Sequence, residues 1–240
     1  MDKTIETLAL TPLDQWANEN KENDIIRKYI RQEKRKPLRY SLYADQTVRD
    51  DTFDNFERDT LARQNVYQRA LVFLKRIVDG EKFNGVLGGS AGTGKTHLAM
   101  SILNALQQRV SMDNYPVYSA MFISAPLLMD WELQKARGDK EFIAKANDKE
   151  RQIKDADVIV FDDFGSETSM RQQVIEASDF IQKTWFRIAD SRVNKVNLFT
   201  TNNSLKELRH IYNEKLISRF MTRDTENFIA FSGIDDKRLR

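Results

Sequence analysis

From Phe53 onward, short apolar runs alternate with longer segments whose apolar residues recur at helical spacing. The pattern predicts a helix over 61–78 that ends before Gly80, because apolar residues return every three or four positions and glycine favours a helix end. It then predicts strands over 85–88, 117–123, 157–161, 195–200 and 226–231, which alternate with helices over 95–109, 125–136, 141–153, 171–190 and 204–221. Such alternation favours an α/β fold with a five-stranded parallel sheet sandwiched by helices.

The first 50 residues have a different pattern. A short helix is predicted from Pro12 to Asn18, and an amphipathic helix that begins near Ile25 ends before Pro37. Seven of the residues from Arg27 to Arg39 are basic and one is acidic. This surface can contact phosphates or an acidic protein, and a merely solvated helix face explains it about as well. We expect a small helical partner-binding segment at 1–50 and a single domain at 51–240.

Composition excludes several classes of protein. The chain has 240 residues, 40% hydrophobic and 31% charged, with a net charge of +2, which is ordinary for a globular domain. Because it has no cysteine, neither a disulfide framework nor a cysteine zinc site is possible. No apolar run is long enough to span a membrane and no secretory signal is present, so we expect a cytoplasmic protein.

The segment 89–96 matches the phosphate-loop pattern G-x-x-x-x-G-K-[ST] and lies between a predicted strand and a predicted helix. Glycines let successive main-chain N–H groups converge on phosphates, Lys95 adds an ammonium group, and Thr96 adds a hydroxyl for Mg²⁺. A chance match is the alternative, but the strand and helix around it argue against chance. We expect ATP and Mg²⁺ to bind here, with these contact residues: Gly89, Ser90, Ala91, Gly92, Thr93, Gly94, Lys95, Thr96 and His97. The ring of His97 has no assigned chemistry and is expected to pack in the first helical turn.

A second element, Val158 to Asp163, is an apolar run that ends in two carboxylates. It predicts a buried parallel strand, and the carboxyl ends of such strands are where ligands bind. Asp162 is placed to hold Mg²⁺ through its water shell, and Asp163 is the better candidate for polarising the attacking water. Capping of the next segment is the weaker alternative for Asp163.

Two further residues follow the fourth predicted strand. If that strand lies between the two motif strands, Asn202 projects toward the γ-phosphate and can orient the water. The segment 202–204 also fits a turn with Ser204 as helix cap, and both roles can hold together. Arg219, on the next predicted helix, can reach the nucleotide of a neighbouring subunit, although an arginine on a helix is usually just solvated.

Together these motifs resemble the AAA+ ATPases that load replicative helicases, of the DnaC/DnaI type, from about residue 50 to the end. The resemblance is carried by residues 52–56, 88–99, 158–167, 200–208 and 217–220. It implies Lys95 and Thr96 on the triphosphate and Mg²⁺, Asp162 on the metal and Asp163 as base. It also implies Asn202 as the polar sensor and Arg219 as an arginine finger supplied in trans. Only Ser232 to Arg240 follow the last predicted strand, so no C-terminal helical lid is expected.

The function implied by the resemblance is ATP-dependent loading of a hexameric replicative helicase onto single-stranded DNA by an ATP-assembled homo-oligomer. DNA-contact candidates are Trp131, Met170 and Arg171, and Phe53 or Phe56 is a candidate for the base. Two alternatives remain open. One is a transposition helper ATPase of the IstB type that binds duplex DNA, and the other is a non-hydrolysing, nucleotide-bound adaptor.

Overall fold

The computed structural model describes residues 38–109, 118–168, 176–221 and 224–236. The helices predicted within residues 1–37 lie outside these ranges, as do Met170 and Arg171. In the described parts of the chain, no helix combines the length and the apolar character that a membrane crossing requires.

Five strands form one sheet in the order β2-β3-β4-β1-β5, and every neighbouring pair is parallel. Their bounds are β1 (Asn84–Gly88), β2 (Ala120–Ser124), β3 (Val158–Asp162), β4 (Val196–Thr201) and β5 (Phe228–Ala230). The predicted parallel sheet is therefore confirmed, with β4 between the two motif strands β1 and β3. The carboxyl ends of all five strands meet at one edge, because parallel strands in register end together.

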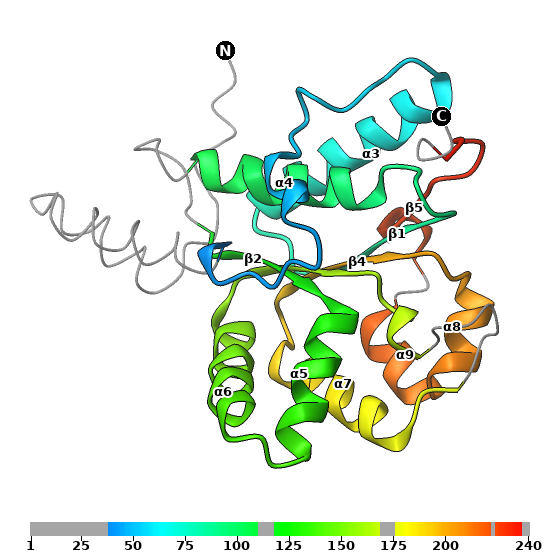
Figure 1. Cartoon of the computed structure of the whole chain (residues 1–240). Helices are drawn as coiled ribbons and strands as arrows, with labels where there is room; N and C mark the ends of the chain where they lie inside the picture. Colours follow the sequence, from blue (N-terminus) through cyan, green and yellow to red (C-terminus); the bar gives the residue numbers. More distant parts are fainter. Residues whose placement is uncertain (1–37, 110–117, 169–175, 222–223, 237–240) are drawn as a thin grey trace, which may run out of the picture.

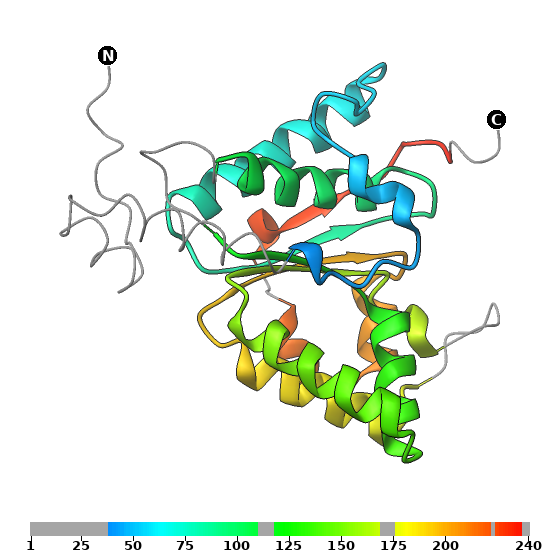
Figure 2. The same ribbon diagram turned by 60° about the vertical axis from the view of Figure 1, so that its left-hand side comes forward.

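Helices cover both faces of the sheet (Figures 1 and 2). One face carries α3 (Leu61–Val78) and α4 (Lys95–Arg109). The other carries α5 (Ala125–Ala136), α6 (Lys140–Asp155), α7 (Asp179–Ser191), α8 (Leu205–Ile211) and α9 (Glu214–Phe220). With both faces covered, β2 and β3 are almost continuous apolar runs, and the residues of β2, β3 and β4 are nearly all buried.

Two predicted helices were wrong in extent. The helix predicted over 171–190 begins at Asp179, where the Ser178 hydroxyl caps it by accepting from the N–H of Ile181, and residues 176–178 are not helical. The helix predicted over 204–221 is two helices. Tyr212 leaves the helical conformation, and the Asn213 side chain accepts from the N–H of Leu216 to start α9. An N-cap residue that satisfies the first free N–H groups of a new helix can interrupt an otherwise helical apolar pattern.

The strand predicted over 226–231 is shorter than expected, because residues 225–227 form a 3₁₀ turn before β5. Similarly, the strand predicted from residue 117 begins at Ala120. Residues 231–236, after β5, contain neither helix nor strand.

Part of the predicted N-terminal segment packs on the sheet. Leu42 forms a parallel bridge with Ile123, and its N–H donates to the carbonyl of Phe122 at 2.8 Å. The 3₁₀ helix η1 (Gln46–Asp50) then lies against α4, where the Asn104 amide donates to the carbonyls of Arg49 and Asp51. Residues 41–50 therefore belong physically with the folded domain, while a boundary at residue 50 stays a prediction.

A buried arginine joins three elements at the end of the sheet opposite the phosphate loop. Arg192 is 2% exposed, and its guanidinium donates to the carbonyls of Ile153, Ala156 and Val196 and to the side-chain oxygen of Asn197. Burial lowers the pKa of Arg192 to about 9. Four acceptors around one cation fix α6, β4 and the end of α7 relative to one another.

Candidate nucleotide-binding site

The phosphate loop connects the end of β1 to the first residue of α4. Thr93 Oγ1 and Lys95 Nζ both donate to the carbonyl of Ser90, at 2.9 and 2.6 Å, which closes the loop on itself. Gly94 has a φ of +98°, and a Cβ built on it would lie 2.9 Å from Phe56 Cε2. Only glycine fits this position without strain, because its backbone is left-handed and a neighbouring ring occupies the side-chain space.

Asp162, the last residue of β3, lies beside the loop. Its Oδ1 accepts from Thr96 Oγ1 at 2.8 Å and from Thr200 Oγ1 at 2.6 Å. Burial raises the pKa of Asp162 to about 6, against the lowering effect of these two hydroxyl donors. The carboxylate and the Thr96 hydroxyl are hard oxygen ligands of the kind Mg²⁺ prefers, and a dication here would offset the burial of the negative charge. The residues present therefore fit the expected metal.

Asp163 and Asn202 complete the same pocket. Asp163 has a φ of +57° and donates its N–H to Thr200 Oγ1 at 2.9 Å, while Asn202 Nδ2 approaches Asp163 Oδ1 at 3.4 Å. Both line a pocket of about 510 Å³ together with Lys95, Thr96 and Asp162. A non-glycine residue in the left-handed region is held there by its surroundings, and such residues occur often at functional sites.

The sequence reasoning missed Thr200, which links the two aspartates by donating to one and accepting from the other. It also missed the pocket wall contributed by residues 44–51, of which Ala44, Asp45, Val48 and Asp51 line the cavity. Two successive threonines at the end of β4 were the available signal for Thr200. Nothing local in the sequence marks residues 44–51.

His97 lies in the first turn of α4 and is held by the chain that precedes α3. Its Nε2 lies 3.0 Å from the carbonyl of Thr52, its Nδ1 lies 3.3 Å from Asp51 Oδ1, and its ring meets Phe56 edge-on at 5.2 Å. Burial raises the pKa of Asp51, and the charge of His97 opposes that rise. The expected packed position of His97 is confirmed. Phe56 is buried beside the loop, and Phe53 packs against Tyr67.

Arg219 is not brought to this pocket. It lies near the end of α9, forms an ion pair with Asp190, and stacks over the ring of Phe186 at 4.9 Å. Its carbonyl accepts from the side-chain N–H of Asn84, the first residue of β1, so it lies at the opposite end of that strand from the phosphate loop. Trp131 on α5 is half-buried, with Phe142 at 6.1 Å.

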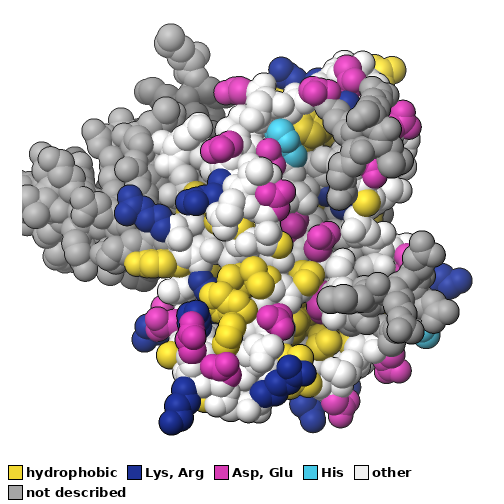
Figure 3. Space-filling model, viewed as in Figure 1, with side chains coloured by type: hydrophobic (Ala, Val, Ile, Leu, Met, Phe, Trp, Pro, Cys, Tyr) yellow, Lys and Arg dark blue, Asp and Glu magenta, His cyan; other side chains and the backbone are white. Residues whose placement is uncertain are grey.

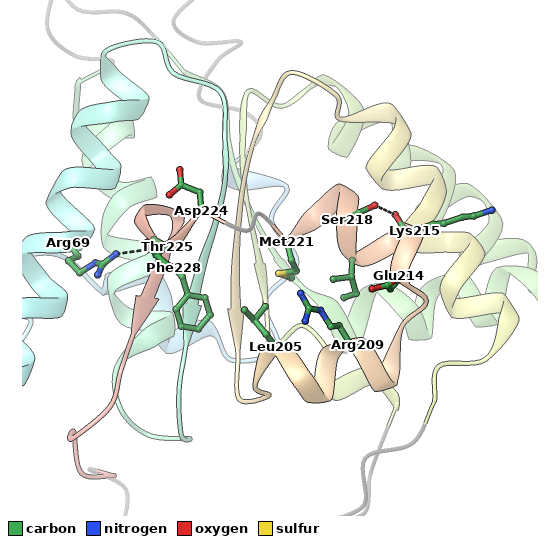
Figure 4. Close-up of a pocket in the computed structure, with 11 residues that line it drawn as sticks. Arg69, Leu205, Arg209, Glu214, Lys215, Ser218, Met221, Asp224, Thr225 and Phe228 are labelled. Atoms are coloured by element: carbon green, nitrogen blue, oxygen red, sulfur yellow. Dashed lines mark hydrogen bonds between the residues drawn. The ribbon is translucent and has the colours of Figure 1, made fainter.

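A second cavity of about 660 Å³ lies between β5 and the helices α8 and α9 (Figure 4). Leu205, Met221 and Phe228 give it an apolar lining, and Arg69 and Arg209 add cations. It contains none of the predicted site residues, so it is separate from the nucleotide pocket. On the face drawn in Figure 3, acidic and basic side chains are interspersed and form no field of one sign.

The family described as ATPase family associated with various cellular activities (AAA) matches residues 86–223, which is more than half of the chain. The chain belongs to this AAA family. The AAA chain is also 27% identical, over 192 residues, to the replicative helicase loader DnaI of Bacillus subtilis (strain 168). That match covers 78% of this chain and 55% of the relative, so the chain spans about half the length of the curated protein it matches.

Solved structures show the same AAA fold. A crystal structure of DnaI has a TM-score of 0.58 and 21% identity, with 82% of this chain and 96% of that chain covered. A crystal structure of the DnaC helicase loader has a TM-score of 0.57 and 20% identity, with 80% and 100% covered. At these identities the likeness establishes the fold, and function has to be argued from the site.

Proposed function

We propose that this AAA protein is an ATP-dependent loader that places a hexameric replicative helicase on single-stranded DNA during replication initiation. It hydrolyses ATP at sites completed by a neighbouring subunit. The observation that carries the proposal is the meeting of Lys95, Thr96, Asp162, Asp163 and Asn202 in one pocket. Similarity to the loader DnaI over 192 residues supports the choice of partner.

Each pocket residue has a distinct task in the proposed reaction. Lys95, now on the Ser90 carbonyl, turns to the phosphates of ATP, and the loop N–H groups hold the remaining phosphate oxygens. Thr96 and Asp162 would hold Mg²⁺, which would neutralise charge on the phosphates. Asp163 accepts a proton from the attacking water or orients it, and the Asn202 amide keeps Asp163 and the water in place.

Arg219 supplies the remaining positive charge from a second copy of the chain. Its side chain is 44% exposed, and Asp190 and Phe186 hold it at the surface. In a homo-oligomer it faces the pocket of the next subunit, where a guanidinium stabilises the charge that develops on the transferred phosphoryl group. ATP binding and assembly are then coupled, because each site contains residues of two subunits.

The helicase contact is proposed for the first 50 residues. Asp45, Val48 and Asp51 line the nucleotide pocket, and Leu42 pairs with β2. A partner that binds just upstream of these residues is therefore connected to the nucleotide by a short stretch of ordered chain. Single-stranded DNA is proposed to follow the inner surface of the oligomer, held by its phosphates and by stacking, with Trp131 among the candidates.

Subunit mixing tests the shared site. Asp163→Asn and Arg219→Ala are each expected to lose most ATP turnover, whereas Arg209→Ala on α8 serves as the control that keeps it. Mixing the two inactive variants should restore part of the turnover, because some sites combine an intact Asp163 with an intact Arg219. If mixtures stay inactive, Arg219 does not act in trans.

Two further measurements separate the alternatives. The loader is supported if single-stranded DNA stimulates ATP turnover. It is also supported if the chain forms a complex with the cognate hexameric helicase in the presence of ATP, as measured by the mass of the complex. Stimulation by duplex DNA without a helicase complex favours the transposition helper. Tight MgATP binding with no turnover under any condition favours the adaptor.

A further inference from the structure

The chain after β5 returns to the phosphate loop (Figure 2). The N–H of Phe231 donates to the carbonyl of Gly88 at 2.8 Å, and a Cβ built on Gly89 would lie 2.8 Å from Phe231 Cβ. Phe231 and Ile234 are 2% and 8% exposed, in the same apolar cluster as the buried residues of α3 and α4. Two buried side chains therefore hold residues 231–236 against the loop.

The Asp236 carboxyl group lies against Gly92, in the middle of the loop, although Asp236 is not among the residues that line the nucleotide pocket. A Cβ built on Gly92 would lie 1.6 Å from Asp236 Oδ1 and 2.2 Å from its Cγ, so the carboxyl group fills the space that any side chain at position 92 would need. Gly92 has a φ of +70° and lies three residues before Lys95. Main-chain N–H groups of this loop cradle the phosphates in proteins with this motif.

A carboxylate here has the same charge sign as the ligand for which the loop is built. Phosphates favour the loop because its N–H groups, the helix N-terminus and Lys95 all present positive charge. A negative group beside Gly92 reduces the positive potential of the loop in the free protein. The same group repels the negatively charged triphosphate as it binds.

We propose that Asp236, through its negative charge beside Gly92, lowers the affinity of the phosphate loop for MgATP. The inference rests on the proposed function only in requiring that the loop binds MgATP.

Calorimetric titration of the full chain with MgATP tests the proposal. Asp236→Asn keeps the shape of the side chain and removes its charge, and we expect its Kd for MgATP to fall about tenfold at low salt. Asp235→Asn removes the same charge from the exposed preceding residue, whose atoms are not among those nearest to Gly92, and is the matched control with an expected change below about twofold. Raising the salt concentration should narrow the difference in Kd between Asp236→Asn and wild type, because Asp236 is still partly exposed and salt screens its charge.

The outcomes are distinct. An unchanged or weaker affinity in Asp236→Asn, with normal binding by wild type, overturns this inference and leaves the proposed function intact. Weaker binding would specifically indicate that Asp236 accepts hydrogen bonds from the nucleotide, for example from ribose hydroxyls. If neither protein binds MgATP, both the inference and the proposed function fail. If Asp235→Asn gains as much affinity for MgATP as Asp236→Asn does, the effect comes from net charge, and the specific role of Asp236 is also overturned.

Discussion

Replacing Asp162 with asparagine should stabilise the nucleotide-free protein while abolishing its response to MgATP. The Asp162 side chain is largely buried, and it accepts hydrogen bonds from Thr96 and Thr200. An asparagine oxygen can accept the same two bonds. The substitution therefore removes the buried charge and keeps the contacts.

The magnitude follows from the pKa of this carboxyl group. Burial raises it from the ordinary value of 3.8 to about 6, an interval that corresponds to about 3 kcal/mol. Because Asp162 keeps some contact with solvent, we expect Asp162→Asn to raise the free energy of unfolding by about 1–3 kcal/mol. The folded protein holds this proton more tightly than the unfolded chain does, so the stability from this group falls as the pH rises from 3.8 to about 6 and stays reduced above it.

Urea unfolding at pH 5 and pH 7.5 measures the effect. Asp162→Asn should be more stable than wild type at pH 7.5, and the two should be closer at pH 5, where the folded wild type already carries the proton. Asp54→Asn, an exposed carboxylate, is the control and should change the free energy of unfolding by less than about 0.5 kcal/mol. MgATP in large excess over its Kd should add about 2–3 kcal/mol to wild type and much less to the variant.

Two results would refute this reasoning. One is a variant that is less stable than wild type at pH 7.5, which would mean that the carboxylate itself stabilises the empty pocket. The other is a stability difference that does not depend on pH, since a packing change has no reason to follow the titration of one carboxyl group.

Three further substitutions test the polar connections within the fold, each by chemical denaturation. Arg192→Met should lower the free energy of unfolding by about 3–5 kcal/mol, because three buried carbonyls and one amide oxygen lose their donor. Glu167→Ala should lower the free energy of unfolding by about 2–4 kcal/mol, since the indole N–H of Trp185 and the Tyr212 hydroxyl both lose their acceptor. The indole nitrogen lies 2.6 Å from Glu167 Oε1, and burial raises the pKa of Glu167. Gly165→Ala should cost about 1–3 kcal/mol, because its φ is +93° and a Cβ would lie 2.5 Å from the side-chain nitrogen of Asn203. A loss below about 0.5 kcal/mol in any of them contradicts the corresponding contact.

The part of the site that could be predicted from sequence is the part that depends on strand ends. Asp162 and Asn202 lie at the ends of apolar runs, and Thr96 lies in the first turn of the helix that follows such a run. Parallel strands bring their carboxyl ends to a single edge of the sheet. Once the strands are assigned, the distances between these residues are largely fixed. The observed strand order places β4 between the two motif strands, which is the condition under which Asn202 was expected to reach the pocket.

The remainder depends on contacts between distant parts of the chain. Asp51 reaches His97 across 46 positions, and Asp236 reaches Gly92 across 144. Nothing in the pattern around either aspartate marks these contacts. The helix errors have a different cause. Ser178 and Asn213 are ordinary N-cap residues, but the helical spacing of the apolar residues extends past both of them. The spacing therefore does not show that a new helix begins after each, where the side chain accepts a hydrogen bond from a main-chain N–H group of the first turn.

The positions of Arg219 and the phosphate loop bear on the proposal that neighbouring subunits share a nucleotide site. The Arg219 carbonyl is held by Asn84 at the start of β1, and the loop begins after Gly88 at its end. Four residue steps along a strand amount to about 13 Å, and the guanidinium points to Asp190 and Phe186 instead of along β1. To reach its own γ-phosphate, Arg219 would have to break the ion pair, leave the ring and cross the length of the strand. The proposed trans arrangement requires none of these changes, because a second copy can meet the guanidinium where it already lies.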